Sequence, residues 1–89
     1  MKVFIRTPKF ERQAKSLFKK HYDPKELFSV LEFLEKDIPL PYKYKDHALV
    51  GDMQGYRECH IKKNWLLVYK VTETAVILLT TGSHDDIFK

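Results

Sequence analysis

The sequence predicts an α+β domain in which an antiparallel sheet carries two helices packed on one of its faces. Three observations predict this fold. A short β-branched and aromatic run opens the chain, two amphipathic stretches with helix-start signals follow, and three more apolar runs with short connections close it. The expected element order is β-α-α-β-β-β, and residues 1–89 are expected to form a single domain.

The first strand is predicted in "KVFIRT", residues 2–7, which is rich in β-branched and aromatic side chains. Thr7 and Pro8 then supply a helix N-cap residue and a proline at the first helical position, where a missing N–H is not needed. An apolar stripe at helical spacing follows, made of Phe10, Ala14, Leu17 and Phe18. The first helix therefore starts at Pro8.

The second helix is predicted to start in the same way, at Asp23-Pro24, with Glu26 in the position that completes a capping box. Its apolar stripe consists of Leu27, Val30, Leu31 and Leu34. Because only about three residues join the two helices, we expect them to pack as an antiparallel pair.

Residues 37–51 carry two prolines and no helical period, which indicates a loop or an edge segment leading to a short strand near Leu49. Three strands are expected next, at 55–61, 65–71 and 75–81. Their connections, "KKN" and "TET", are short enough to require antiparallel hairpins. With both helices on one face of this sheet, the other face is left partly open for a site.

The composition is that of a soluble protein of the reducing cytoplasm. Apolar residues make up 44% and charged residues 31% of the chain, and no apolar run approaches the roughly 20 residues that cross a bilayer. The N-terminus lacks the pattern of a secretion signal. The one cysteine, Cys59, has no partner for an internal disulfide and is expected to fill the core as a small apolar side chain.

Positive charge gathers at the start of the chain. Within residues 1–20 only Glu11 is acidic, and the basic residues are Lys2, Arg6, Lys9, Arg12, Lys15, Lys19 and Lys20. This pattern fits either a solvated helix surface or a surface that binds an anionic partner, either nucleic acid or an acidic protein.

Three of the four histidines stand beside acidic residues. His21 instead ends a lysine-rich helix, where a cation suits the helix dipole. His47 follows Asp46, His84 precedes Asp85 and Asp86, and His60 lies two positions after Glu58. Because residues i and i+2 of a strand share a face, Glu58 and His60 are expected to point together, away from Cys59.

Three interpretations of this histidine set stay open on spacing alone. Zinc binding is the first, although no HxxxH or CxxC spacing supports it. Surface residues with no shared role are the second. Metal-free acid–base catalysis is the third, in which one group removes a proton and another protonates the leaving group. On a basic surface its natural reaction is RNA cleavage, where the 2′-hydroxyl of the substrate is the nucleophile.

The C-terminal half carries a specific combined pattern: K-D-H-x-L, then G-Y-R-[DE]-x-H, then L-L-V-Y, then G-[ST]-H-x-x-[IL]-F. It resembles the YafQ branch of the RelE/ParE superfamily, bacterial toxins of type II toxin–antitoxin modules that act as messenger-RNA endonucleases. The N-terminal half agrees with that family in layout. The resemblance implies a RelE-like, microbial-RNase-like fold and an endoribonuclease (mRNA interferase) that needs no metal or other cofactor.

The resemblance implies a catalytic set of His47, Glu58, His60 and His84. We expect His84 to be the general acid, His60, oriented by Glu58, the general base, and His47 a group that holds the phosphate. The order of acid and base stays open. The aromatic Phe88 in the tail is expected to support an RNA base by stacking.

Two positions depart from the family pattern. Where the family usually has an arginine four residues before the tail histidine, this chain has Thr80, and where it often has an acid before the second hairpin strand, this chain has Asn64. The arginine would stabilise charge on the phosphate. Candidates to supply that charge here, and to bind substrate, are Lys45, Arg57, Lys62 and Lys63.

The resemblance also implies partners. An acidic, largely disordered segment of a cognate antitoxin is expected to fold against the basic first helix, and promoter DNA is expected to bind only through the antitoxin. The substrate is expected to be mRNA, free or on the ribosome, with no membrane involved. The main alternative is a relative that inhibits without cutting, either a gyrase poison or a ribosome binder. The second alternative is a weakly active RNA-binding domain.

Overall fold

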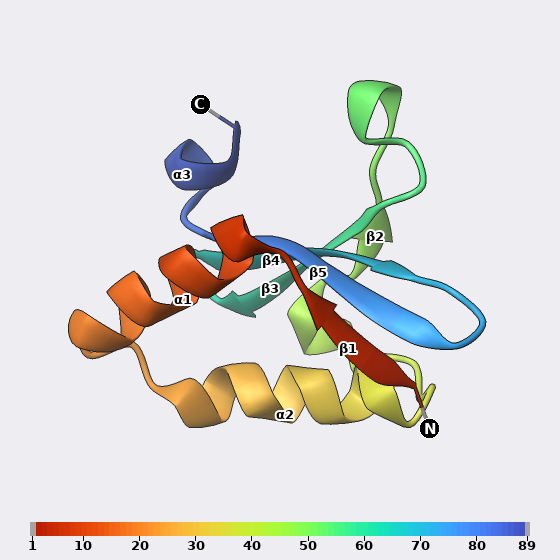
Figure 1. The fold of residues 1–89 in the computed structure, drawn as a ribbon, viewed down its shortest axis with the longest axis horizontal. Coiled ribbons are helices and arrows are strands. Elements are labelled where there is room, and N and C mark those ends of the chain that lie inside the picture. The colour runs from red at the N-terminus through yellow and green to blue at the C-terminus, as the bar shows by residue number, and fades with distance from the viewer. Residues whose placement is uncertain (1, 89) are drawn as a thin grey trace.

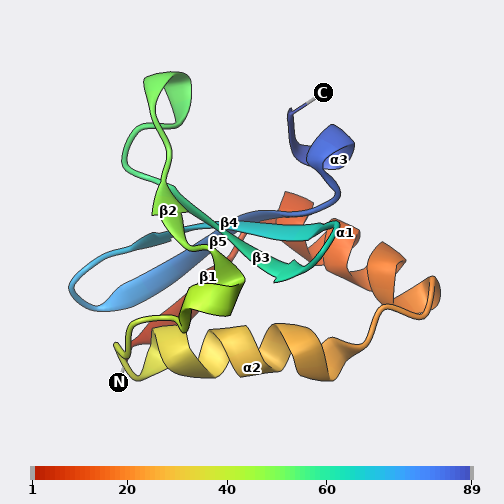
Figure 2. The same cartoon turned by 180° about the vertical axis from the view of Figure 1, so that it is seen from behind.

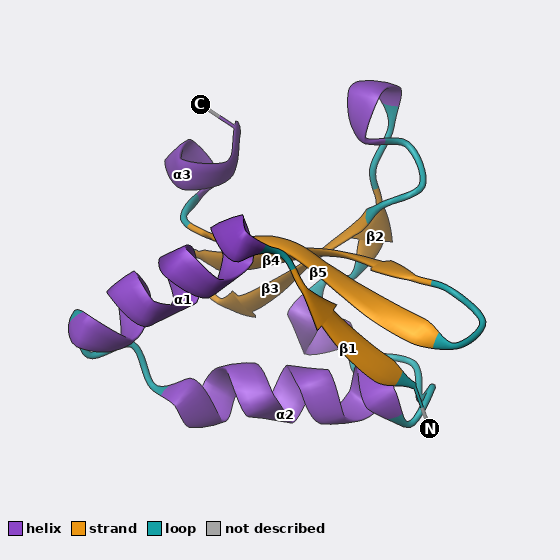
Figure 3. Ribbon diagram, viewed as in Figure 1, coloured by secondary structure: helices purple, strands orange, loops and turns teal. Residues whose placement is uncertain are grey.

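The computed structural model describes residues 2–88. They contain five strands, three α-helices and two 3₁₀ helices (Figures 1 and 3). In chain order they are β1 (Val3–Arg6), α1 (Pro8–Lys19), α2 (Pro24–Glu35), η1 (Tyr42–Tyr44), β2 (His47–Ala48), η2 (Gly51–Met53), β3 (Arg57–Lys62), β4 (Trp65–Val71), β5 (Ala75–Gly82) and α3 (His84–Phe88). The predicted α+β class and order of the main elements are confirmed, and the tail adds α3.

The sheet has the strand order β1-β5-β4-β3-β2. Strands β2 to β5 pair antiparallel, but β1 pairs parallel to β5. The sheet is therefore mixed, and not wholly antiparallel as the sequence predicted. The two hairpins fix the direction of β5. No tight turn joins β1 to β5, so β1 could pair with this edge of the sheet in either the parallel or the antiparallel direction.

Both predicted N-caps are present. Thr7 Oγ1 accepts a hydrogen bond from the Phe10 N–H at 3.0 Å, and Asp23 Oδ1 accepts one from the Lys25 N–H at 2.9 Å. The capping box predicted for Glu26 is not formed: Asp23 caps through the Lys25 N–H, and the Glu26 carboxylate lies 3.3 Å from Lys62 Nζ at the end of β3. None of the helices found in residues 2–88 has the length and apolar character needed to cross a membrane.

The core lies between the two helices and one face of the sheet, here called the helix face. Its buried side chains are Phe10, Ala14 and Leu17 of α1, Leu27, Val30 and Leu34 of α2, Tyr44 of η1, and Cys59, Ile61, Trp65, Leu67, Tyr69, Val76 and Leu78 of the sheet. The apolar stripes predicted for the two helices are thus the ones that pack, and the opposite face of the sheet is left to carry other side chains.

The two helices run in opposite directions but diverge from the turn that joins them (Figures 1 and 2). A groove of about 810 Å³ lies between them and is floored by side chains of β1 and β5. We call it the helix groove. Its apolar lining includes Phe4, Phe18, Phe28 and Leu31. The two helices are therefore antiparallel, as expected, but a groove separates them along part of their length.

Cys59 is a core residue, as predicted, with no exposed surface. Burial raises the pKa of its thiol well above the ordinary value, so the reactive thiolate is suppressed. We expect iodoacetamide to leave Cys59 unmodified in the native protein and to alkylate it fully in denaturant, as measured by intact mass. Rapid alkylation of the native protein would contradict this placement.

Candidate functional site

The face of the sheet opposite the helices, here called the site face, presents two adjacent rows of side chains. In the first row the strand register aligns His47, Glu58 and Val68, and it continues to Thr80 of β5, whose hydroxyl turns to Gln13 of α1. In the second it aligns His60, Leu66 and Gly82. Rows two residues apart on a strand are separated by about 6.6–7 Å. The predicted residues of β2 and β3 therefore lie together on one face.

Two segments flank the site face. In Figures 1 and 2, α3 rises from the sheet at one side, and the loop between β2 and β3, which contains η2, rises at the other. His84 is the first residue of α3 and follows Gly82, the last residue of β5, by two positions. His84 therefore lies just beyond Gly82, the last residue of the row that contains His60.

Glu58 forms an ion pair with His47 across the strand ladder. Its Oε1 lies 3.3 Å from His47 Nε2, and its side chain is 5% exposed whereas that of His47 is 50% exposed. The sequence predicted that Glu58 would orient His60, its neighbour in the strand. The structure instead gives it the histidine directly opposite on β2, because cross-strand pairs approach more closely than residues i and i+2.

The contacts of the His47 ring indicate where its protons lie. Its Nδ1 is 2.9 Å from the carbonyl oxygen of Lys45, which can only accept, so Nδ1 must donate. Its Nε2 faces Oε1 of Glu58, so the ring is held between the Lys45 carbonyl and the Glu58 carboxylate next to the site face.

The second carboxylate oxygen of Glu58 has an unusual environment. Among the buried side-chain oxygens and nitrogens in residues 2–88, Glu58 Oε2 is the one without a hydrogen-bond partner. An unsatisfied buried acceptor costs about 1–3 kcal/mol and is more often found at a functional site than in an ordinary core.

The start of α3 is built by a reciprocal cap that holds His84 in place. Ser83 N–H donates to Asp86 Oδ2 at 3.0 Å, and Asp86 N–H donates to Ser83 Oγ at 3.2 Å. Gly82 permits the tight turn: it has φ of 145°, and a Cβ there would come within 2.9 Å of the Asp86 side chain. The sequence analysis missed this cap, which the spacing Ser-x-x-Asp signals.

Phe88 lies one turn after His84 on α3. Their ring centroids are 5.1 Å apart with an interplanar angle of 45°, and Phe88 is 43% exposed. The predicted aromatic is therefore beside the tail histidine and available to another planar group.

A pocket of about 420 Å³ opens beside His60, where β3 extends beyond its two-residue partner β2. We call it the basic pocket. Its lining contains one acid, Glu26, and is otherwise basic, aromatic or apolar: Lys43, Tyr44, Lys45, His60, Ile61, Lys62 and Lys63. Three of the four predicted substrate-binding cations, Lys45, Lys62 and Lys63, thus meet around one of the predicted histidines.

Arg57, the fourth predicted cation, lies elsewhere. Its guanidinium donates to both carboxylate oxygens of Asp46, with Nη2 at 2.9 Å from Oδ2. Tyr69, a buried residue of the helix face, donates to the same carboxylate. Arg57 is therefore on the opposite side of the strand from Glu58, where a carboxylate already binds its guanidinium, and its contact with substrate stays a prediction. The acid of the K-D-H motif, Asp46, is the sequence signal that could have predicted this partner for Arg57.

Thr80 and Asn64, the two departures from the family pattern, take different positions. Thr80 is 2% exposed, and its hydroxyl donates to Gln13 Oε1 of α1 at 2.6 Å. It joins α1 to β5 and supplies no charge. Asn64 is exposed in the turn between β3 and β4. The cations nearest His60 are thus those of the basic pocket.

Within residues 2–88 no group of three histidine, cysteine or acidic side chains is arranged to hold a metal ion. His47 and Glu58 are paired, but no third ligand joins them in the part of the chain that is described. The histidines and the glutamate on the site face are groups that can donate and accept protons, and the basic pocket lies beside them.

Comparisons with known proteins identify the family of the chain. Residues 2–89 match the family described as "Bacterial toxin of type II toxin-antitoxin system, YafQ". The chain is 35% identical over 80 residues to the mRNA interferase toxin YafQ of Escherichia coli strain K12, an alignment covering 89% of this chain and 87% of that protein.

Solved structures agree as well. The toxin in the E. coli DinJ-YafQ complex is 31% identical, with a TM-score of 0.91 and full coverage of both chains. A metal-bound toxin from Helicobacter pylori is 39% identical, with a TM-score of 0.92 over 99% of this chain and 100% of that one. The predicted RelE-like fold is confirmed, and the chain belongs to the YafQ family of bacterial toxins from type II toxin–antitoxin systems.

Proposed function

We propose that the protein, with residues 1–89 as one toxin domain, is a metal-independent endoribonuclease that cleaves mRNA in the bacterial cytoplasm, free or on the ribosome, and thereby inhibits translation. The observation that carries this proposal is the gathering of His47, Glu58 and His60 on the site face, with His84 at its border. The curated E. coli relative is named an mRNA interferase, which supports the same activity.

In the proposed reaction the substrate supplies the nucleophile. His60 removes the proton of a ribose 2′-hydroxyl, and the 2′-oxygen attacks the adjacent phosphorus. The bond to the 5′-oxygen breaks, and His84 gives that oxygen its proton. The products are a 2′,3′-cyclic phosphate and a free 5′-hydroxyl, so protons and electrons balance without a metal or cofactor.

The His47–Glu58 pair has a separate role in this proposal. His47 Nε2 lies beside Glu58, and in this proposal a proton on it is shared with a phosphate oxygen as negative charge grows there. Glu58 holds that ring in place. This supplies part of the stabilisation that the arginine of other family members would give where this chain has Thr80.

The basic pocket is the proposed site for the RNA backbone next to the cleaved bond. Its lysines, Lys43, Lys45, Lys62 and Lys63, extend from His60 around the free edge of β3. Lys62 already lies 3.3 Å from Glu26, so a phosphate would compete for it with that carboxylate. Phe88, beside His84, is the proposed platform for one base, and stacking there would contribute about 1–3 kcal/mol.

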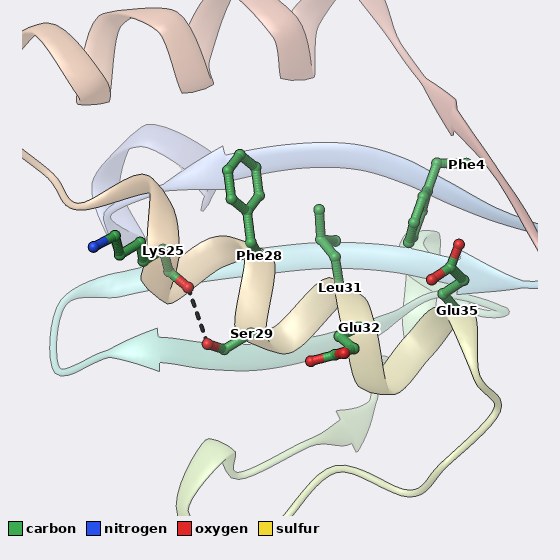
Figure 4. A pocket seen from close by; sticks show the side chains of 7 residues that line it. All are labelled: Phe4, Lys25, Phe28, Ser29, Leu31, Glu32 and Glu35. Carbon is green, nitrogen blue, oxygen red and sulfur yellow. Dashed lines mark hydrogen bonds between the residues drawn. The ribbon is translucent and has the colours of Figure 1, made fainter.

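The helix groove is the proposed docking site of a cognate antitoxin. Its apolar lining includes Phe28, which is 58% exposed and which, with Phe4 and Leu31, also lines a smaller pocket along α2 (Figure 4). Its α1 side carries Arg12 and Lys15, while Arg6 is paired with Glu11 at 3.4 Å. An amphipathic acidic segment matches this surface, and promoter DNA would be bound through the antitoxin.

The proposed reaction is tested by incubating the purified chain with RNA and mapping the ends of the products. We expect 2′,3′-cyclic phosphate or 3′-phosphate ends together with 5′-hydroxyl ends. Products with 5′-phosphate ends would contradict attack by the 2′-hydroxyl. Inhibition of translation without any cleavage, on or off the ribosome, would favour a non-catalytic relative of the family.

We expect EDTA to leave the cleavage rate unchanged, because acid–base groups alone perform the proposed chemistry. The measurement is the initial rate on a fluorescent RNA before and after chelation. A loss of activity that added zinc restores would instead indicate a metal at the site.

A further inference from the structure

The carboxylate of Asp46 joins three strands at the border of the site face. It receives two hydrogen bonds from Arg57 Nε of β3, both at 3.2 Å, and one from Arg57 Nη2 at 2.9 Å. The hydroxyl of Tyr69 on β4 donates to its other side. We call Asp46, Arg57 and Tyr69 the carboxylate clamp. Its members belong to the helix face, behind the candidate site.

Few backbone hydrogen bonds hold the strand that contains His47, the next residue. It belongs to a strand of two residues that pairs only with Glu58 and Arg57, continued by one hydrogen bond from the Leu49 N–H to the Tyr56 carbonyl at 2.9 Å. Consecutive residues of an extended chain point to opposite faces. Fixing the Asp46 side chain behind the sheet therefore fixes the direction in which the His47 ring leaves it.

The two donors of the clamp, Arg57 and Tyr69, keep their protons. The hydrogen bond and the charge of Asp46 outweigh desolvation and raise the pKa of Arg57 above its usual value. Burial, with the hydrogen bond to Asp46 next in effect, raises the pKa of Tyr69 well above its usual value. Both groups thus remain donors in any physiological buffer, and Tyr69, which is 1% exposed, holds the carboxylate from its buried side, while the Asp46 side chain as a whole is 22% exposed.

We infer that the carboxylate clamp is a positioning device that holds the His47 ring against Glu58 for the cleavage reaction. The inference rests on the proposed function, since it assigns Asp46, Arg57 and Tyr69 to the support of one of its groups. None of the three contacts the RNA; they act through His47.

A double-mutant cycle on RNA cleavage tests the inference. We expect Tyr69→Phe, which removes one donor and keeps the ring, to lower kcat about tenfold with little change in KM, because small displacements of catalytic groups are costly. In a His47→Ala background the same change should have no further effect on kcat. An equal fall in both backgrounds would show a general structural role, and no fall in the wild-type background would also overturn the inference.

Two further variants guard against loss of folding. Arg57→Lys keeps the charge but loses the two-point contact, and it should reproduce the loss in kcat at an unchanged Tm. Tyr22→Phe is the matched control: it removes a hydroxyl from a ring that packs on Trp65, away from Asp46, and should leave kcat unchanged. If Tyr69→Phe unfolds the protein, Arg57→Lys decides the outcome.

A second measurement does not depend on activity. Imidazole ¹H–¹⁵N spectra of the folded protein should show the His47 ring resonances moving in Tyr69→Phe while those of His21 stay in place. Unmoved His47 resonances would overturn the positioning role. If the wild-type protein cleaves no RNA but the resonances move, the proposed nuclease activity has failed and the structural role of the clamp stands.

Discussion

Replacing His84 with alanine is expected to reduce RNA cleavage by at least about 10²-fold, the usual contribution of a general acid. His84 sits at the first position of α3, where Gly82 and the cap between Ser83 and Asp86 fix its backbone at the border of the site face. Removing the imidazole leaves that cap intact, so the fold should persist. The measurement is kcat on a defined RNA, with the melting temperature as the check on folding.

His21→Ala provides the matched control for this change. His21 follows the end of α1 and belongs to none of the groups on the site face. Its removal should leave the cleavage rate unchanged. A His84→Ala variant that cuts at the wild-type rate would refute the role of His84 as acid, and an equal loss in both variants would point to a general effect on the protein.

Replacing Phe28 with aspartate is expected to weaken antitoxin binding by about 2–4 kcal/mol, or roughly 30- to 1,000-fold, as for a central aromatic of an interface. Phe28 borders the helix groove, and its side chain leaves α2 on the same side as that of Leu31 (Figure 4). The introduced carboxylate would also repel an acidic segment. RNA cleavage should be retained, because the groove and the site face lie on opposite sides of the sheet.

The affinity for the cognate antitoxin can be measured by calorimetry, and neutralisation by the recovery of RNA during co-incubation. Val50→Asp is the control, because Val50 is 85% exposed and follows β2, outside the groove. It should bind the antitoxin as the wild type does. If Phe28→Asp binds equally well, the antitoxin docks on another surface.

The order of the main elements was predictable because their signals are local. Thr7 and Asp23, each followed by proline, mark the helix starts, and both caps are present. The short connections "KKN" and "TET" fix the hairpins. The burial of Cys59 followed from the period of two in a strand. In each case the information lies within a few residues of the chain.

The relations between distant residues were less predictable. The parallel pairing of β1 with β5, and the position of Arg57 against Asp46, depend on strand order, for which the sequence offered no local signal. Likewise Glu58 stands opposite His47 only because the β2–β3 register places it there. The family resemblance named the residues of the site, but not which of them contact one another.

If His47, His60 and His84 act on one phosphate, an RNA with 2′-O-methyl groups, which binds but cannot be cut, should affect all three rings at once. In imidazole ¹H–¹⁵N spectra of such a titration we expect the three ring resonances to shift together, with one common dissociation constant, while His21 stays unchanged. Shifts of only one of the three rings, or shifts that follow different binding curves, would contradict it.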